Sequence, residues 1–340
     1  MKGYLPTLDG WRALAVAAVI VCHAGGTIAP EWRWLTVKGA VGVDVFFAIS
    51  GLLICGRLLE EWKAEGGVDL GAFYTRRAFR ILPAYWFYLG AAALLVHPAP
   101  RDLAACLLFV RNYLPAPANW FTGHFWSLAV EEHFYMLLPG ALYFLGPRRL
   151  RIALPAAALA IAVWRMVDFR WHVLTAHIPG VSFLMRTDIR LDGLLWGAFA
   201  AVVLHSDGGA EFARRWLGVW TWRGAALAFV ACVLWQPPLA MLWIALLAPV
   251  LLAGTVLHPH RHAGRVLDWE PLRWVGRLSY SLYLWQQLFF APEGEPRVLG
   301  AWQEWPLAPA GVLACALISY LLVEQPLIRL GRRAPRMAAA

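Results

Sequence analysis

Two ionisable residues lie on one face of the first apolar stretch of the chain. Arg12 and His23 are eleven residues apart, which in a helix is three turns plus about 20° and roughly 16 Å along the axis. Ionisable groups inside an apolar helix are costly and by default mark a pathway or a reacting centre. Plainer interpretations stay open: Arg12 can anchor the helix at an interface by pairing with Asp9, and His23 can serve helix packing alone.

Carboxylates in two later apolar stretches are expected at the depth of His23. Asp44 falls about one turn inside the second stretch, and Glu131 shares a helix face with Ser127 and Tyr135. A histidine beside a carboxylate suits general-base chemistry, because the acid fixes the imidazole tautomer and stabilises the imidazolium. The same three ionisable groups can also relay protons in a transporter, so depth alone does not separate an enzyme from a transporter.

An arginine pair precedes the third apolar stretch. Arg77 and Arg80 share a helix face, and Pro83 suits the first turn of a helix. Two forked guanidinium groups near a helix N-terminus are suited to bind phosphate. Ordinary positive charge at the cytoplasmic face, or contact with anionic lipid, is the alternative. The pair offers a way to hold a phosphorylated cytoplasmic donor beneath a membrane-embedded base.

The composition excludes most soluble classes. Of 340 residues, 60% are apolar and 15% are charged, whereas soluble domains have about 45–50% and about 25%. The 20 Trp residues fit a bilayer interface, where an amphipathic indole is stable. An integral membrane protein is therefore predicted. The five scattered Cys residues lack metal-binding spacing, and no metal is expected.

Ten stretches approach the roughly 20 apolar residues that a membrane-spanning helix needs. They predict an all-α integral membrane protein with about ten transmembrane helices, in which residues 1–330 form one domain and residues 331–340 form a basic cytoplasmic tail. The expected spans are 8–23, 40–58, 81–97, 126–145, 151–169, 190–205, 217–235, 238–257, 274–291 and 307–328.

The distribution of Lys and Arg between these spans predicts the orientation. With the N-terminus inside, the segments on that side hold more than twice as many Lys and Arg as the opposite side. Cytoplasmic loops carry such an excess, so both termini are predicted to be cytoplasmic. The net charge of +9 is thereby explained by orientation, and no nucleic-acid partner is expected.

Several motifs in order along the chain resemble the acyltransferase 3 family of integral membrane O-acyltransferases. The motifs cover nearly the whole chain. Because so many of them occur in the same order as in the family, the resemblance is specific. The matching segments are 8–12 with His23, 42–47, 49–51, 77–83, 126–131, 190–197, 279–285, and Glu324 with Pro326.

The resemblance implies a ten-helix bundle that moves an acyl group, usually acetyl, from coenzyme A to a hydroxyl of a carbohydrate or natural product. By matching position, His23 takes the role of the catalytic base, Glu131 that of the acidic residue of the fourth span, and three arginines that of donor-binding residues: Arg12, Arg77 and Arg80. Supporting roles fall to further motif residues: Ser50, Trp126, Ser127, Tyr135, Tyr280, Tyr283 and Glu324. No oxyanion donor is singled out among Ser50, Ser127 and Tyr135.

Two positions depart from the family pattern. His133 stands where Gln is expected, and Gln286 stands where His is expected. The two residue types look exchanged, either as a compensated hydrogen-bonded pair or through independent change at separate sites. The family's optional C-terminal esterase-like domain is not expected here, so the membrane bundle is predicted to perform the whole reaction.

The sequence predicts an O-acyltransferase of the bacterial inner membrane. Its expected partners are acyl-CoA, a carbohydrate or glycosylated acceptor, and membrane lipids. His23, oriented by Asp44 or Glu131, is predicted to deprotonate the acceptor hydroxyl. The rival hypothesis is a transporter or flippase of a lipid-linked sugar or acyl donor, with the same three residues as a proton relay. The internal repeat that transporters often show is not found.

Overall fold

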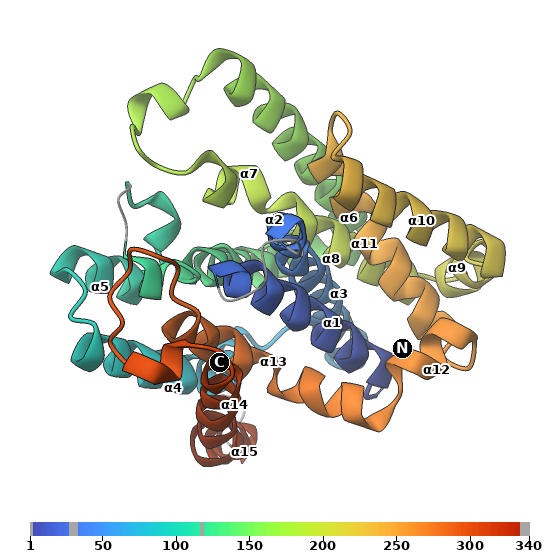
Figure 1. Ribbon diagram of the computed structural model, residues 1–340. Coiled ribbons are helices and arrows are strands. Elements are labelled where there is room, and N and C mark those ends of the chain that lie inside the picture. Colours follow the sequence, from blue (N-terminus) through green and yellow to red (C-terminus); the bar gives the residue numbers. More distant parts are fainter. Residues whose placement is uncertain (1–2, 27–32, 116–118, 334–340) are drawn as a thin grey trace.

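The structure is a computed structural model that describes residues 3–26, 33–115 and 119–333, and this part of the chain contains helices and no strand. Figure 1 shows the arrangement of the helices. The longer helices are α1 (Pro6–His23), α3 (Val41–Glu65), α4 (Leu70–Leu95), α6 (Phe125–Trp171), α8 (Asp192–His205), α10 (Val219–Trp235), α11 (Ala240–Leu257), α13 (Glu270–Phe289) and α14 (Leu307–Ile318). A π-helical turn, Ser319–Glu324, joins α14 to α15 (Gln325–Arg333). Each of the ten predicted stretches is largely helical, and the stretch 307–328 covers α14, the π-helical turn and the start of α15.

Short helices flank the longer ones. They are α2 (Arg33–Gly39), α5 (Pro100–Leu107), α7 (Thr187–Arg190), α9 (Gly209–Trp216) and α12 (His262–Leu267). The basic tail predicted for residues 331–340 lies outside the described residues from position 334 onward, and α15 ends at Arg333.

The chain is a multi-pass membrane protein by the length and composition of its helices. Five helices in the described residues are long and apolar enough to cross a membrane, or six if the bent pair α9 and α10, which meet at 77°, forms one span. Helices α1 and α13 carry charged and amide side chains, and α8 is short, so they fall outside this group. The number of ten spans and the cytoplasmic termini stay predictions.

One long helix covers two of the predicted spans. Within α6 the backbone leaves the helical region at Gly146, where φ is 68° and ψ is 167°. A positive φ is readily adopted only by glycine, and Pro147 follows directly. The break therefore falls between the predicted spans 126–145 and 151–169.

Helix α4 begins earlier than predicted. Asp69 caps its N-terminus, because the carboxylate accepts a hydrogen bond of 2.9 Å from the backbone N–H of Ala72. Pro83 consequently lies inside the helix and not in its first turn. Arg77 and Arg80 also lie inside the helix, so the prediction that they stand near a helix N-terminus, whose N–H groups would help to bind phosphate, is wrong.

Close helix packing forms the centre of the bundle. Helix α3 packs against α1 on one side and against α8 on the other, while α13 packs along α1. At the α3–α8 crossing, a Cβ added to Gly51 would lie 2.1 Å from the carbonyl oxygen of Leu194. A Cβ added to Gly197 would lie 2.3 Å from the carbonyl oxygen of Ala48. Only glycine permits this backbone contact, which is the usual means of close approach between membrane helices.

Gly51→Ala should therefore destabilise the fold. The added methyl group has no space unless α3 and α8 separate, and overpacking of this kind costs about 1–3 kcal/mol. Gly90→Ala on α4 is the matched control, because nothing lies within 4 Å of an added Cβ there; helix propensity predicts an unchanged or slightly higher stability. Unfolding in mixed detergent micelles measures both, and equal stability of the two variants would contradict the close crossing.

Candidate active site

His23 is the last residue of α1 and faces aromatic and amide side chains. Its ring lies edge-on to Trp120, with ring centroids 5.5 Å apart. The amide of Gln286, on α13, is a further polar neighbour. The buried Nδ1 atom of His23 and both side-chain amide atoms of Gln286 nevertheless complete no hydrogen bond in the described structure. Unpaired buried polar atoms are rare, so this group is a candidate for contact with a reacting molecule.

A second buried histidine lies beside this group and was missed by the sequence analysis. His124 precedes α6, and the side-chain oxygen of Gln287 accepts its backbone N–H at 2.9 Å and lies 2.5 Å from its Nδ1. Because this oxygen accepts, Nδ1 carries the hydrogen and Nε2 is the acceptor nitrogen of the neutral ring. The buried Nε2 has no hydrogen-bond partner in the part of the chain that the structure describes. Its position two residues before the Trp126–Ser127 pair is the signal that could have found it.

Further polar groups continue from His124 along α6. The hydroxyls of Ser127 and Tyr283 lie within hydrogen-bond distance of each other and of the carbonyl oxygen of His124, so one hydroxyl donates to the other, which in turn donates to that carbonyl. Two turns below His124, Glu131 accepts hydrogen bonds from Ser50 at 3.0 Å and from Tyr135 at 2.7 Å. The predicted sharing of one face by Ser127, Glu131 and Tyr135 agrees with these contacts.

Arginines from three helices gather at the other end of these polar groups. The guanidinium carbon of Arg77 lies 4.0 Å from the ring centroid of Tyr135. Arg80 lies close enough to Arg12, Arg57 and Arg77 to be repelled electrostatically by their positive charges. A cavity of about 210 Å³ opens beside Arg77 and is lined also by Tyr135. The plainer interpretation of Arg12 as a partner of Asp9 is confirmed, with a distance of 3.2 Å.

Two of the predicted supporting residues lie at this end of the bundle. Glu324 is an electrostatic neighbour of Arg80 and accepts a hydrogen bond from Ser281. Tyr280 donates to the carbonyl oxygen of Ile81 at 3.0 Å. These contacts tie α13 and the π-helical turn to α4 next to the arginines.

Together these groups form a polar column through an apolar bundle. It runs from His23 and His124, through Ser127 and Glu131, to the arginine cluster of Arg12, Arg57, Arg77 and Arg80. Its length follows from α1, since eleven residues span roughly 16 Å in a helix. The described residues include no group of three or more His, Cys, Asp or Glu side chains arranged to hold a metal.

Asp44 lies outside the column, which corrects its predicted contact with His23. Its carboxylate pairs with Arg190 at 2.9 Å. Trp126 belongs to the same cluster, because the guanidinium carbon of Arg190 lies 5.4 Å from its ring. Glu131 does not contact His23 either, since its two oxygens accept from Ser50 and Tyr135. A carboxylate can fix a histidine only within hydrogen-bond distance, so neither acid orients His23 in this structure.

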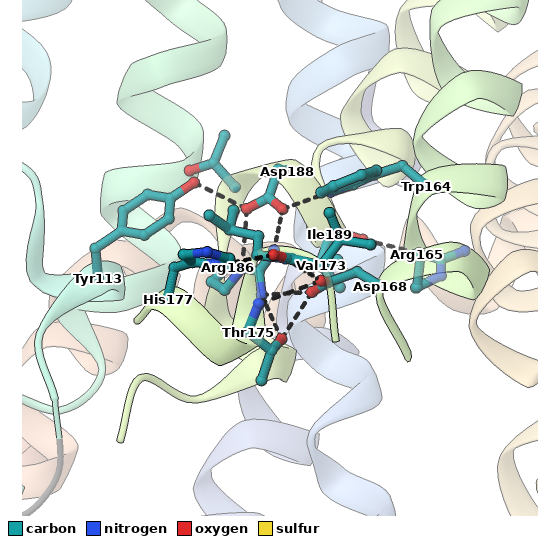
Figure 2. A network of polar contacts seen from close by, with 12 residues as sticks. Tyr113, Trp164, Arg165, Asp168, Val173, Thr175, His177, Arg186, Asp188 and Ile189 are labelled. Atoms are coloured by element: carbon teal, nitrogen blue, oxygen red, sulfur yellow. Dashed lines mark hydrogen bonds and ion pairs between the residues drawn. The ribbon is translucent and has the colours of Figure 1, made fainter. Parts of the chain in front are cut away.

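A buried ionic network holds the segment that carries Arg190 (Figure 2). Arg186 is fully buried and donates to Asp168 at 2.7 Å and also to Asp188. Asp188 accepts further hydrogen bonds from Trp164 at 2.7 Å and from Tyr113 at 3.0 Å. Burial alone would raise the pKa of Asp188, but the hydrogen bonds from Arg186 and Trp164 outweigh it and lower the pKa. The network fixes the segment that connects α6 to α8, and it thereby fixes the position of α7 within this segment.

The apparent exchange of His133 and Gln286 does not correspond to a contact. His133 Nδ1 is hydrogen-bonded to Thr187 of α7 at 2.7 Å, whereas the Gln286 amide lies near His23. The compensated pair is therefore wrong for this structure. His133 belongs to the segment around α7, and only Gln286 belongs to the column.

Comparison with known proteins decides the family. A family model described as an acyltransferase domain, that of acyltransferase 3, matches residues 5–324. The chain belongs to this acyltransferase family. No solved structure matches the chain.

Three curated relatives resemble this acyltransferase. Peptidoglycan O-acetyltransferase OatA of Listeria monocytogenes is 29% identical and aligns with 97% of this chain and 57% of its own length. Putative peptidoglycan O-acetyltransferase YrhL of Bacillus subtilis is 28% identical, over 97% of this chain and 56% of its own. O-acetyltransferase OatA of Staphylococcus aureus is 30% identical, over 83% and 50%. The chain thus spans about half the length of these relatives.

The Asp44–Arg190 pair generates a stability prediction for this acyltransferase. Arg190→Gln leaves a mostly buried carboxylate, 18% exposed, without its partner, which should cost up to about 3 kcal/mol of unfolding free energy. Adding Asp44→Asn removes that charge and should recover part of the loss, so the double-mutant cycle should show coupling. Unfolding in mixed micelles measures the four proteins. Strictly additive losses would mean that the two side chains do not interact.

Proposed function

We propose that this chain is an O-acyltransferase that moves an acetyl group from acetyl-CoA to a hydroxyl of a cell-envelope glycan. The observation that carries the proposal is the polar column, which joins unpaired imidazole nitrogens at one end to an arginine cluster at the other. Family membership supports acyl transfer as the reaction. Two relatives are named for peptidoglycan, so a cell-wall polysaccharide is the acceptor class that we propose.

The arginine cluster is the proposed binding site for the phosphates of the donor. Arg77 has a buried Nε atom without a partner among the described residues, and Arg80 lies near the like charges of Arg12 and Arg77 as well as near Glu324. Mutual repulsion of clustered guanidinium groups is relieved by a polyanion, and each guanidinium can donate two parallel hydrogen bonds to a phosphate. A donor held there can extend its thioester along the column towards His23.

His23 is the proposed general base. An unpaired ring nitrogen accepts the proton of the acceptor hydroxyl while the oxygen attacks the thioester carbonyl. The C–S bond then breaks, and the departing thiolate takes the proton from the imidazolium, which leaves an ester, free coenzyme A and a neutral histidine. In place of a carboxylate, Gln286 and Trp120 are the side chains that lie beside the ring. The hydroxyls of Ser127 and Tyr283, which lie between His124 and Glu131, are candidate donors to the oxyanion.

The orientation of the column supports a location in the bacterial inner membrane. The arginine cluster lies at the end of α1 that is predicted to be cytoplasmic, where acyl-CoA is present. His23 lies at the opposite end of α1, towards the side where cell-wall glycans are found. The transporter hypothesis has less support, because Asp44 pairs with Arg190 and is not in contact with His23 or Glu131.

His23→Asn should reduce acetyl transfer by about 10²- to 10⁴-fold, the range for loss of a general base. The measurement is release of free coenzyme A by the purified protein with a glycan acceptor. His97→Asn, at an exposed position outside the column, is the matched control and should retain wild-type turnover. Wild-type turnover of a well-folded His23→Asn protein would remove His23 from the mechanism.

Arg77→Gln and Arg80→Gln should mainly raise the KM for acetyl-CoA. A charge-assisted contact contributes about 1.5–3 kcal/mol, which corresponds to roughly 10- to 150-fold in apparent affinity. Contacts to phosphate act on the ground and transition states alike, so kcat should change little. Arg76→Gln is the control, since Arg76 is exposed and pairs with Glu61. An unchanged KM in both column variants would assign these arginines to structure or lipid contact.

A further inference from the structure

A second cavity lies outside the column, lined by α10, α11, α12 and the residues that connect them. Figure 1 shows these helices on the side of the bundle away from α4 and α5. The cavity has a volume of about 380 Å³, and we call it the α10–α12 cavity. The residues of its wall that matter here are Trp222, Arg223, His258, His260, Arg261 and Arg265. A Cβ added to Gly10 of α1 would touch the backbone of Leu267 in α12. The cavity therefore lies at the Arg12 end of the bundle, which is predicted to face the cytoplasm.

The arginines of this cavity, Arg223, Arg261 and Arg265, are exposed at its wall, unlike the more deeply buried arginines elsewhere. Arg165, Arg186 and Arg190 each pair with an aspartate. Arg223, Arg261 and Arg265 pair with no carboxylate in the described part of the chain, and no described residue of the wall is acidic. Arg265 Nε donates only to the carbonyl oxygen of His260, at 2.8 Å. The cavity wall is therefore strongly positive.

The local backbone and the histidines add to this positive potential. Val219, the first residue of α10, lines the cavity, so the N-terminus of α10 lies at the cavity wall. The preceding residue, Gly218, has no side chain that could cap the free N–H groups of the helix. Such N–H groups attract anions. His258 follows α11, and its pKa is lowered by burial and by the nearby charges of Arg261 and Arg214. A bound anion would relieve this repulsion.

The surroundings of the cavity are those of a membrane interface. Trp216 and Trp220 are 62% and 79% exposed, and exposed Trp side chains favour the level of the lipid headgroups. Phe212 lies one turn before Trp216 on the short helix α9 and is also exposed. Further along α10, Leu227 is 72% exposed and forms part of an outward apolar face. A basic cavity thus adjoins a surface suited to acyl chains.

We propose that the α10–α12 cavity binds the phosphate headgroup of an anionic membrane phospholipid, whose acyl chains lie along the outer face of α10. Basic pockets between membrane helices on the cytoplasmic side recognise such headgroups. Guanidinium groups provide paired hydrogen bonds to phosphate oxygens, and the apolar helix face covers the chains. A soluble phosphate ester shares the headgroup chemistry but gains nothing from the exposed face of α10.

The test is lipid binding by the delipidated full-length protein, followed by native mass spectrometry. We expect saturable binding of phosphatidylglycerol in preference to phosphatidylcholine with the same chains. The double variant Arg223→Gln/Arg261→Gln should bind phosphatidylglycerol at least tenfold more weakly. The double variant Arg148→Gln/Arg149→Gln removes the same charge from exposed arginines outside the cavity and should bind like wild type. Equal weakening in both double variants, or no lipid preference in wild type, would overturn the proposal.

A further variant tests whether the space of the cavity, and not only its positive charge, is needed for lipid binding. Ala263 lines the cavity, and Ala263→Phe fills space while leaving every arginine in place, so it should also weaken binding at least tenfold. Unchanged binding by Ala263→Phe would mean that lipid contacts only the basic surface and would overturn the cavity site. Displacement of the lipid by millimolar inorganic phosphate would assign the site to a soluble phosphate ligand instead. Thermal unfolding of each variant confirms that it is folded.

Discussion

The close approach of helix backbones at buried glycines is the constraint on which the structure depends. Membrane helices gain little from the hydrophobic effect against one another, so their association relies on van der Waals contact and hydrogen bonds. Gly51 and Gly197 bring α3 against α8, and Gly276 of α13 contacts the backbone of Asp9 in α1. With these helices in contact, side chains from α1, α3, α4, α6 and α13 reach one another in the polar column.

Buried charges in this bundle fall into two groups with different consequences. Arg165, Arg186 and Arg190 are neutralised by aspartates and hold α3, α6, α7 and α8 together. Removing one partner of such a pair lowers the free energy of unfolding strongly, so these pairs stabilise the packing of the helices. In contrast, His23 and His124 retain ring nitrogens that have no partner among the described residues, and Arg80 lies among the like charges of Arg12, Arg57 and Arg77. Unsatisfied polar groups are expected where another molecule supplies the missing partner. The column has this character, whereas the arginines of the α10–α12 cavity are exposed.

The sequence predicted the positions of helices better than the contacts between them. Ten apolar stretches all coincide with helices, because apolar composition and length act locally. Asp44 shows the limit: its depth in the second span was predicted, but its partner is Arg190 and not His23. Depth is a coordinate along one helix and does not specify the rotation of that helix about its axis. His124 was missed for a related reason, since its significance comes from Gln287, which is distant in the sequence.

By itself the sequence determined the membrane class, the helical fold, the family motifs and the shared face of Ser127, Glu131 and Tyr135. These properties follow from composition and from the 3.6-residue period of one helix. Only the tertiary structure decided which arginines are paired, which histidine nitrogens are free, and that Pro83 lies within α4. It also brought basic residues of α10, of α12 and of the connection between α11 and α12 to one cavity. Pairing and burial are properties of several helices at once, so they appear only when the bundle is packed.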